Sequence, residues 1–248
     1  YVQIKNESIV SIDNQTNSVT CVSSSGKIIK GSILIGADGS KGITRKYICG
    51  SNDLISKNKY VLRTSIPFDK HNKILQKSSI NLWLGNGWHL VHYPILDSKF
   101  INLVLVPKSC IPDFSKFERE EFTSLSNIKW IKVSNKSKVF QSTYSSGNIC
   151  LIGDAAHPFP PHLAQGAAQT FIDGSELFRQ LSLFGSTRKA SIEYSKSRFE
   201  KVNQVINSSN LAGKIMGLSG VTAKIRNTAI LFAGTHLQNF IYDLWNYK

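Results

Sequence analysis

The 248-residue sequence has few cysteines, few acidic residues and no long apolar run. Its four cysteines stand far apart without a C-x-x-C pair, which argues against a disulfide framework or a zinc site and suits reduced thiols in a cytoplasmic protein. The longest apolar runs, such as Ile33–Ile35 and residues 229–233, are much shorter than the roughly 20 residues that cross a bilayer. We therefore expect neither a metal centre nor a transmembrane segment.

Acidic residues are outnumbered: 16 Asp and Glu stand against 30 Lys and Arg, which gives a formal net charge of +14. The basic residues are scattered along the chain instead of being clustered. Nucleic-acid-binding domains concentrate their basic residues on one face or in a recognised motif. We therefore expect no specific nucleic-acid partner, and any nonspecific attraction to polyanions should weaken as salt is added.

The hydrophobic pattern divides the chain into strand-rich and helix-rich parts. Alternation predicts strands near the N-terminus, the last of them ending in a glycine turn before a short helix, and then a run of separated strands typical of an antiparallel sheet. A buried strand at 148–152 precedes a mostly helical remainder. The expected strands cover residues 2–12, 19–22, 27–35, 60–66, 79–84, 88–95, 100–106 and 148–152, and the expected helices 42–48, part of 114–125, 164–183, 187–211, 221–232 and 236–246.

The strongest chemical pattern is the string Gly-Asp-Ala-Ala-His-Pro-Phe-Pro-Pro-His-Leu-Ala-Gln-Gly-Ala-Ala over residues 153–168. A buried strand delivers Asp154 at its carboxyl end, where α/β sheets hold ligands. A proline-stiffened loop then leads into a helix whose first free N–H groups, around Gln165–Ala167, carry partial positive charge. Each feature alone is often only a turn or a helix start. In this order they predict a site for a hydroxyl-bearing, electron-rich cofactor.

This string resembles the G-D-A-A-H-P motif of the FAD-dependent aromatic hydroxylases, which are single-component flavoprotein monooxygenases, in their salicylate-hydroxylase-like branch. Residues 36–40, Gly-Ala-Asp-Gly-Ser, together with Arg45 are similar to the second FAD motif of that family. Weaker similarity extends the resemblance over nearly the whole chain, through residues 84–95 and 102–104 to Tyr194, Arg198 and Val202. The resemblance implies an α/β fold with α+β elements: the remainder of a Rossmann-like FAD-binding domain, an inserted, mainly antiparallel β-sheet substrate domain and C-terminal helices.

The resemblance also implies domain boundaries. Residues 1–57 are expected to form the first part of the FAD-binding domain, and residues 58–145 the substrate-binding sheet. Residues 146–185 should return to the FAD-binding domain, and residues 186–248 should form a C-terminal helical region. The chain begins with Tyr in strand-like sequence and holds no G-x-G-x-x-G fingerprint, so we expect it to be N-terminally truncated and inactive alone.

Cofactor contacts are implied position by position. Asp154 would accept a hydrogen bond from the ribityl chain of FAD, Pro158–Pro161 would line the flavin face, and the following helix would direct its N–H groups at the pyrimidine edge. Asp38 and Arg45 would lie near the pyrophosphate and take part in docking NAD(P)H. The implied cofactor-binding residues are Asp38, Gly39, Arg45, Gly153, Asp154, Pro161, Ala164, Gln165, Gly166 and Ala167.

The reaction that the resemblance implies is hydroxylation of a small aromatic, a phenol or an aromatic carboxylate, with NAD(P)H and O2 through a peroxide at the flavin ring. Strand alternation puts His89 and Tyr93 on one face and His92 on the other, so at most one of the two histidines should face the substrate. His89, as a base, Tyr93 and Pro161 are the expected catalytic residues. The candidate residues lining the pocket are Arg63, Trp83, His89, His92 and Tyr93.

Other interpretations remain open at this point. The substrate could instead be a quinone precursor or an isoprenoid, although residues 164–168 differ from the G-Q-G-L-N string that quinone-ring hydroxylases resemble. The chain could also be a truncated, non-catalytic remnant, which the missing Gly-rich unit supports. Thr44, Gly42, Ile172 and Gly174 depart from the family pattern, which fits either drifted specificity or relaxed selection. His157 is expected to hydrogen-bond the backbone, and apolar residues within 231–245 could form a homodimer contact.

Overall fold

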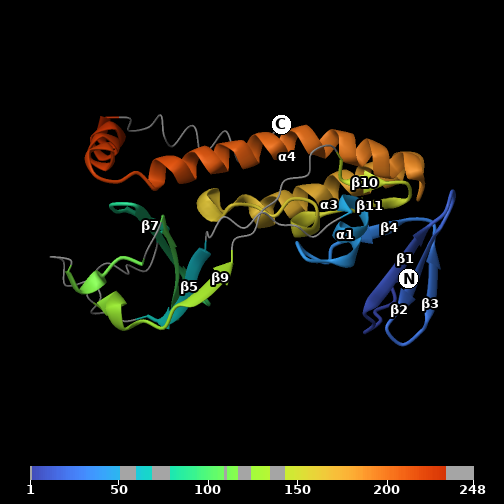
Figure 1. The fold of residues 1–248 in the computed structure, drawn as a ribbon, viewed down its shortest axis with the longest axis horizontal. Coiled ribbons are helices and arrows are strands. Elements are labelled where there is room, and N and C mark those ends of the chain that lie inside the picture. The colour runs from blue at the N-terminus through green and yellow to red at the C-terminus, as the bar shows by residue number, and fades with distance from the viewer. Residues whose placement is uncertain are drawn as a thin grey trace. The chain divides into compact units, whose positions relative to one another are not determined.

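The computed structural model describes residues 2–50, 60–68, 79–108, 111–116, 124–134 and 143–232. Within them the chain has a mixed α/β fold that divides into two compact units, drawn in Figure 1. The first unit is Tyr1–Ile55 with Lys136–Asn210, and the second is Ser56–Asn135 with Leu211–Lys248. The first unit is thus built from two stretches that are far apart in the sequence. The helix predicted at 236–246 lies outside the described residues.

The first unit opens with an antiparallel sheet of β1 (Ile9–Asn14), β2 (Val19–Ser23) and β3 (Ile28–Gly31), in that order. The prediction of one strand over 27–35 is wrong, because the chain forms β3 and then β4 (Leu34–Gly36), which belongs to another sheet. Gly31 ends β3, as glycine weakens a strand interior. The hydrophobic alternation continues across this break and so does not reveal that the strand changes partner.

β4 lies in a second sheet of order β10 (Ser145–Ser146), β11 (Ile149–Leu151) and β4. β11 and β4 are parallel, with Ile149 beside Leu34 and Leu151 beside Gly36. β4 leads to α1 (Ile43–Cys49), and β11 leads into the short helical turns η3 (Gly153–Ala155) and η4 (Pro161–Leu163). Because parallel strands end at the same edge, both sequence motifs leave the sheet side by side.

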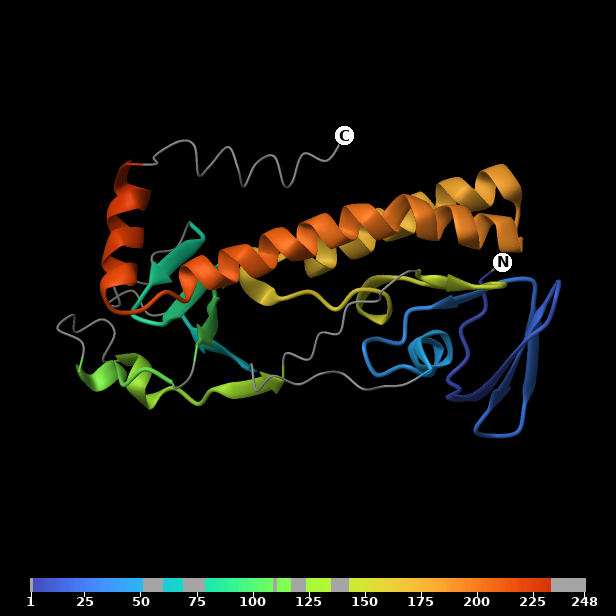
Figure 2. The ribbon, with the colours of Figure 1, turned by 45° about the horizontal axis from the view of Figure 1, so that its top comes forward.

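Two long helices follow: α3 (Gln165–Phe184), in the first unit, and α4 (Arg188–Met216), which belongs to the first unit up to Asn210. They run alongside one another in both ribbon views, Figures 1 and 2. Leu177 of α3 packs with Tyr194 and Val202 of α4 in a buried cluster that also takes in Leu151 of β11. The helices were predicted near these positions, although α4 continues beyond the expected end at 211. Their packing fixes the strand that precedes Asp154 against the helix that follows it.

The second unit contains a five-stranded antiparallel sheet. Its order is β6 (Asn81–Leu84), β7 (Trp88–Ile95), β8 (Phe100–Pro107), β5 (Tyr60–Pro67) and β9 (Ile131–Ser134). The helix expected within 114–125 is represented by two short turns, η1 (Phe114–Lys116) and η2 (Ser124–Asn127), and residues 117–123 between them are outside the described part. The core on one face of the sheet consists of Leu62, Trp88, Leu90, Ile101, Leu103, Leu105, Phe114 and Leu125.

After α4, residues 221–232 are helical as predicted. Arg226 of this helix is buried and donates from Nη1 to Met216 O at 2.7 Å and from Nη2 to Gly85 O at 3.0 Å. The guanidinium therefore ties the end of α4 to the turn between β6 and β7. No helix in the described ranges is long and apolar enough to span a membrane.

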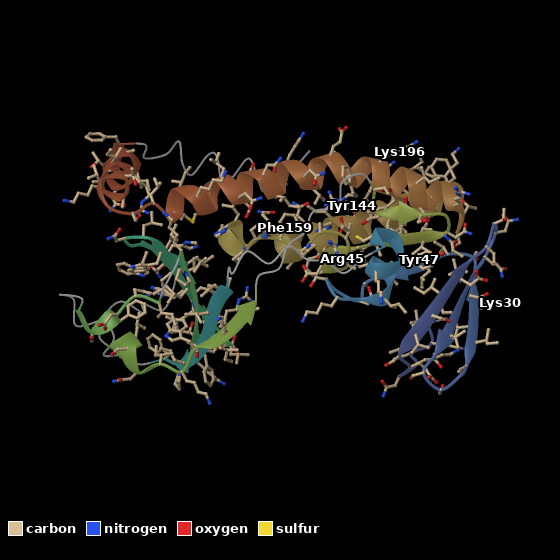
Figure 3. The ribbon with its side chains drawn as sticks, in the orientation of Figure 1. Lys30, Arg45, Tyr47, Tyr144, Phe159 and Lys196 are labelled. Atoms are coloured by element: carbon tan, nitrogen blue, oxygen red, sulfur yellow. The ribbon has the colours of Figure 1, made fainter. Side chains whose placement is uncertain are left out.

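Basic side chains are distributed over several elements. Lys30 on β3 and Lys196 on α4 are both exposed, and Figure 3 shows them on separate parts of the first unit. Lys196 also pairs with Glu193 at 2.9 Å. This spacing agrees with the scattered basic residues of the sequence.

Candidate functional site

The Gly-Asp turn after β11 presents a single carboxylate to solvent. Gly153 has φ +58°, a conformation that glycine adopts without steric cost, and a Cβ added there would lie 3.0 Å from the Thr170 side chain. Residues 153–157 are all described, and among them only Asp154 is exposed. Ala155, Ala156 and His157 are buried beneath it.

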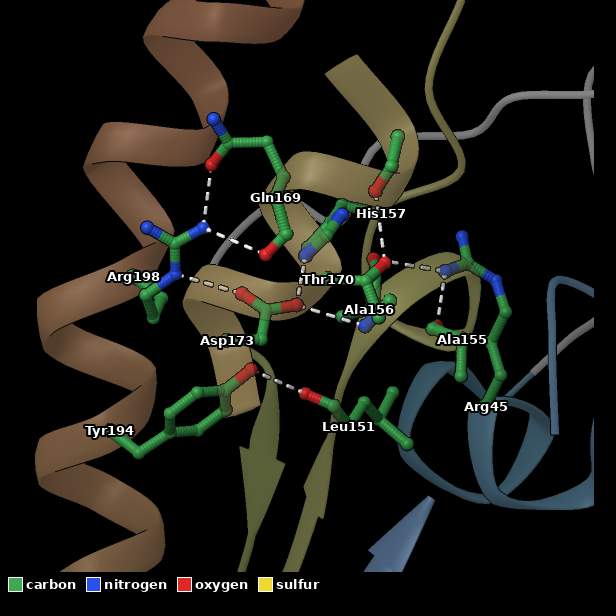
Figure 4. A network of polar contacts seen from close by, with 12 residues as sticks. Arg45, Leu151, Ala155, Ala156, His157, Gln169, Thr170, Asp173, Tyr194 and Arg198 are labelled. Atoms are coloured by element: carbon green, nitrogen blue, oxygen red, sulfur yellow. Dashed lines mark hydrogen bonds and ion pairs between the residues drawn. The ribbon is translucent and has the colours of Figure 1, made fainter. Parts of the chain in front are cut away.

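A buried carboxylate on α3 holds this turn, as Figure 4 shows. Asp173 is 0% exposed and accepts hydrogen bonds from Gly153 N at 2.9 Å and His157 Nε2 at 2.5 Å through Oδ2, and from Arg198 Nε at 2.8 Å through Oδ1. Burial by itself raises the pKa of Asp173, but the hydrogen bonds from His157, Gly153 and Arg198 outweigh it and hold the pKa below its usual value. Asp173 is therefore an ionised acceptor at neutral pH.

The prediction that the His157 side chain hydrogen-bonds the backbone is wrong, because the ring instead contacts Asp173. An ionised carboxylate can only accept, so Nε2 carries the proton. The other ring nitrogen, Nδ1, is buried without a hydrogen-bond partner in the described part of the chain, which agrees with this tautomer. The partner comes from a helix 16 residues later, so the local sequence of the loop does not indicate it.

Two further side chains fix the same segment from other elements. Arg45 of α1 is 3% exposed, and its Nη1 donates to Ala155 O at 2.7 Å and to Ala156 O at 3.1 Å. Burial lowers the pKa of this guanidinium. Tyr194 of α4 donates its hydroxyl proton to Leu151 O at 2.9 Å. Arg45 thus joins the two sequence motifs, and the pyrophosphate and NAD(P)H roles expected for it stay predictions.

The Asp38 loop explains two departures from the family pattern. The Asp38 carboxylate accepts from Thr44 N at 2.9 Å and also from the Thr44 hydroxyl, so it caps the start of α1. A Cβ on Gly42 would lie 2.0 Å from Asp38 Cγ. Gly42 and Thr44 therefore fit one local arrangement, in which glycine leaves room for the carboxylate and threonine binds it.

The start of α3 is uncapped and strained. Ala164 precedes the helix at φ +53° and ψ 27°, a left-handed conformation that is uncommon for a residue other than glycine, and no side chain caps the first turn. Gln165 is 1% exposed, and its Nε2 meets no hydrogen-bond partner among the described residues. Free N–H groups at a helix start and a strained backbone are both features of ligand sites. Pro161 begins η4 directly before this point, and Ala164 and Ala167 are exposed.

The sheet of the second unit separates the predicted pocket residues between its two faces. His89 pairs with Val106, and Tyr93 pairs with Asn102, whereas Leu90 and His92 pair with core leucines of β8. Alternation therefore puts His89 and Tyr93 on the face opposite the core, as predicted, and the register of β5 puts Arg63 on the same face.

Trp83 and His92 lie on the core face, where their rings stack with centroids 6.1 Å apart. Of the five candidates, Trp83 and His92 therefore lie on the opposite side of the sheet from Arg63, His89 and Tyr93, and the two histidines are on different faces, as strand alternation predicts. Burial lowers the pKa of His92, which is 0% exposed.

The predicted cofactor residues all belong to the first unit, whereas His89 and Tyr93 belong to the second. The loops that follow β4 and β11 meet at one edge, so Asp38, Arg45 and Asp154 come from adjacent segments. Asp173 and Gln169, which both accept hydrogen bonds from Arg198, were not predicted as site residues. A signal did exist: the helical period puts Gln169, Asp173 and Leu177 on one buried stripe, and an acidic residue there requires partners.

Residues 111–209 match the protein family described as FAD binding domain. The chain is 28% identical over 233 residues to a 3-hydroxybenzoate 6-hydroxylase of Polaromonas naphthalenivorans (strain CJ2), an alignment that covers 87% of this chain and 58% of the relative. The chain thus spans about three fifths of the length of that relative.

Solved structures agree in fold. Klebsiella pneumoniae HpxO, crystallised with FAD and uric acid, superposes with a TM-score of 0.79 at 17% identity, covering 97% of this chain and 65% of HpxO. A salicylate hydroxylase substrate complex superposes with a TM-score of 0.67 at 22% identity, covering 98% of this chain and 68% of the hydroxylase. The chain is thus similar in sequence to an aromatic-ring hydroxylase and shares the mixed α/β fold of these solved structures, as its motifs predict.

Proposed function

We propose that the protein is an FAD-dependent monooxygenase that uses NAD(P)H and O2 to hydroxylate a small aromatic ring bearing a hydroxyl or carboxylate group. The observation that carries this proposal is the exposed Asp154 carboxylate, held in a tethered turn beside α3, whose first N–H groups are uncapped. An acceptor and a set of free donors are thereby offered from adjoining segments. This combination suits a cofactor that has both hydroxyl groups and a ring able to carry negative charge.

The residues present fit FAD. Asp154 would accept hydrogen bonds from the sugar-alcohol hydroxyls of FAD, and the N–H groups at the start of α3 would favour negative charge on a ring placed there by about 0.3–1 kcal/mol. Ala164, Gly166 and Ala167 are small, so a flat ring approaches the helix start without steric conflict. FAD, when bound, supplies the electron transfer and oxygen activation, while the protein binds and orients it.

We assign the substrate roles to the face of the second unit's sheet that lies opposite its core, where Arg63 is exposed and His89 is buried. Arg63 provides a fixed cation for a carboxylate, and its guanidinium suits bidentate binding of that group. His89 would take the proton of a phenol, since an imidazole titrates near working pH, and Tyr93 would orient the ring beside it. Val91 and Val104 share this face and would exclude water from the reacting ring.

The relatives support an aromatic substrate over an isoprenoid or a quinone precursor. The curated relative reported above is a 3-hydroxybenzoate 6-hydroxylase, and the superposed hydroxylase is one that acts on salicylate by its name. Both names describe single aromatic rings that carry a hydroxyl and a carboxylate. We therefore favour a hydroxybenzoate as the substrate class.

Because the chain as given is expected to be inactive alone, the test is NAD(P)H oxidation by the full-length protein in the presence of FAD. It is measured against a panel of hydroxybenzoates, phenols, a quinone precursor and an isoprenoid. We expect a hydroxybenzoate to raise the oxidation rate and to be converted to a product heavier by one oxygen atom, seen by mass spectrometry. A rate that no aromatic acid changes, with no hydroxylated product, would overturn the proposal. Stimulation by the isoprenoid alone would favour the alternative substrate class.

A further inference from the structure

A single carboxylate oxygen accepts hydrogen bonds from the first and the last residue of the turn that contains Asp154. Asp173 Oδ2 accepts from the main-chain N–H of Gly153 at the start of the turn and from the ring Nε2 of His157 at its end, as Figure 4 shows. Within the turn, the main-chain N–H groups of Ala156 and His157 donate to Gly153 O at 2.9 and 2.8 Å. The five residues therefore form a closed loop around a single acceptor.

The position of that acceptor is itself fixed. Arg198 donates from Nε to Asp173 Oδ1 at 2.8 Å and from Nη2 to Gln169 Oε1 at 2.7 Å, so the guanidinium joins two successive turns of α3 to α4. Asp173 and Arg198 are 0% and 3% exposed. A buried, doubly held charge pair has little freedom to move, because separating it would leave an uncompensated charge in the interior.

Apart from Asp154, the residues of the turn are buried. Arg45 binds the carbonyl groups of Ala155 and Ala156, and these residues are buried together with His157. The Asp154 side chain alone leaves the turn for solvent. Everything that fixes the turn thus fixes where the Asp154 carboxylate is directed.

We propose that Asp173 is a positioning residue for the flavin site: through Gly153 and His157 it sets the orientation of Asp154 toward the hydroxyl groups of FAD. This inference rests on the proposed function, which makes Asp154 a flavin ligand. Asp173 contacts no cofactor itself and acts through the turn. Its charge keeps His157 in the tautomer with the proton on Nε2, so the ring also closes the turn.

The first experiment needs no cofactor. Asp173→Asn is compared with the unmodified protein by amide hydrogen exchange. Glu176→Gln serves as the matched control, because Glu176 lies on the same helix but binds Arg179 and Gln180 of that helix and makes no bond to the turn. We expect exchange of the Gly153 and His157 amides to become about tenfold faster or more in Asp173→Asn, since hydrogen bonds to a charged group are among the stronger ones. The control should leave these amides unchanged.

A second variant covers the case in which Asp173→Asn does not fold. His157→Gln leaves the Asp173–Arg198 pair intact and removes only the ring that closes the turn, so faster exchange confined to residues 153–157 is expected. Exchange in the turn that stays unchanged in both variants would overturn the proposal.

The second experiment separates positioning from general stability by titrating FAD against Asp173→Asn, Asp154→Ala and the double variant. If Asp173 acts through Asp154, the double variant should bind FAD no more weakly than Asp154→Ala alone. Independent effects that multiply in the double variant would contradict positioning. The titrations use the full-length protein, whose failure to bind FAD would overturn the proposed function, while the exchange experiment would still decide whether Asp173 orders the turn.

Discussion

Asp154 is the residue whose removal should affect flavin binding most directly. It is exposed at the end of β11, and its neighbours in the turn are buried and tethered. A hydrogen bond from a hydroxyl to a carboxylate contributes about 1.5–3 kcal/mol, so Asp154→Ala should weaken FAD binding by about tenfold or more. Quenching of flavin fluorescence during titration measures the change.

The control for this prediction is Glu200→Ala, which removes another exposed carboxylate of the first unit from α4. It should leave the FAD affinity as it was, because Glu200 lies outside the loops that follow β4 and β11. If both variants lost affinity equally, the effect would belong to net charge and not to the site.

Residues with a local signature could be predicted from the sequence, and residues defined by tertiary contacts could not. Asp154 follows a short buried strand and a glycine, so its position at the edge of a sheet could be predicted from the sequence. Asp173 lies eight residues into a helix, and its partners Gly153 and Arg198 are 20 and 25 residues away. Only the packing of α3 against the turn and α4 makes it part of the site. The two faces of β7 were predictable, because alternation is a property of the strand itself.

At the scale of elements, α3 contains a glycine that no contact requires. Gly174 lies in the helix interior, is exposed, and a Cβ added there would meet nothing within 4 Å. Gly174→Ala should therefore raise the free energy of unfolding of the first unit by about 1 kcal/mol, the difference in helix propensity between the two residues. Urea unfolding followed by circular dichroism measures this change.

Gly153→Ala is the matched comparison for that helix substitution. Its positive φ costs about 1–2 kcal/mol for an alanine, and the Thr170 side chain at 3.0 Å must also move. The two glycine variants should thus shift the unfolding midpoint in opposite directions. Stabilisation of both would show that the turn is free to relax, which would argue against the tethering described above.

Element boundaries were harder to predict than element types. The apolar pattern at 27–35 predicted one strand, yet β3 pairs with β2 and β4 pairs with β11. The partner of β4 lies more than 100 residues away, and the periodicity of a single segment holds no information about such a partner. β9 and β10 were not predicted for a different reason: they are four and two residues long, too short to show a clear alternation.

At the scale of the whole molecule, the chain has two units with separate hydrophobic cores. Leu105 belongs to the core of the sheet unit, and Leu177 belongs to the cluster between α3, α4 and β11. Truncating a buried leucine to alanine costs about 2–5 kcal/mol, in large part from the cavity left behind. Leu105→Ala should therefore speed amide hydrogen exchange in β5, β7 and β8, and Leu177→Ala should speed it in β11 and α3.

Each variant is the control for the other, because both remove the same atoms from a buried site. Regions with their own cores open with their own free energies, so protection should fall in the unit that carries the substitution and persist in the other. Equal loss of protection in both units from either substitution would show one cooperative structure instead. The distinction bears on function, because the proposed flavin contacts and the proposed substrate residues lie in different units, and separate opening would allow the substrate face to change without loosening the Asp154 turn.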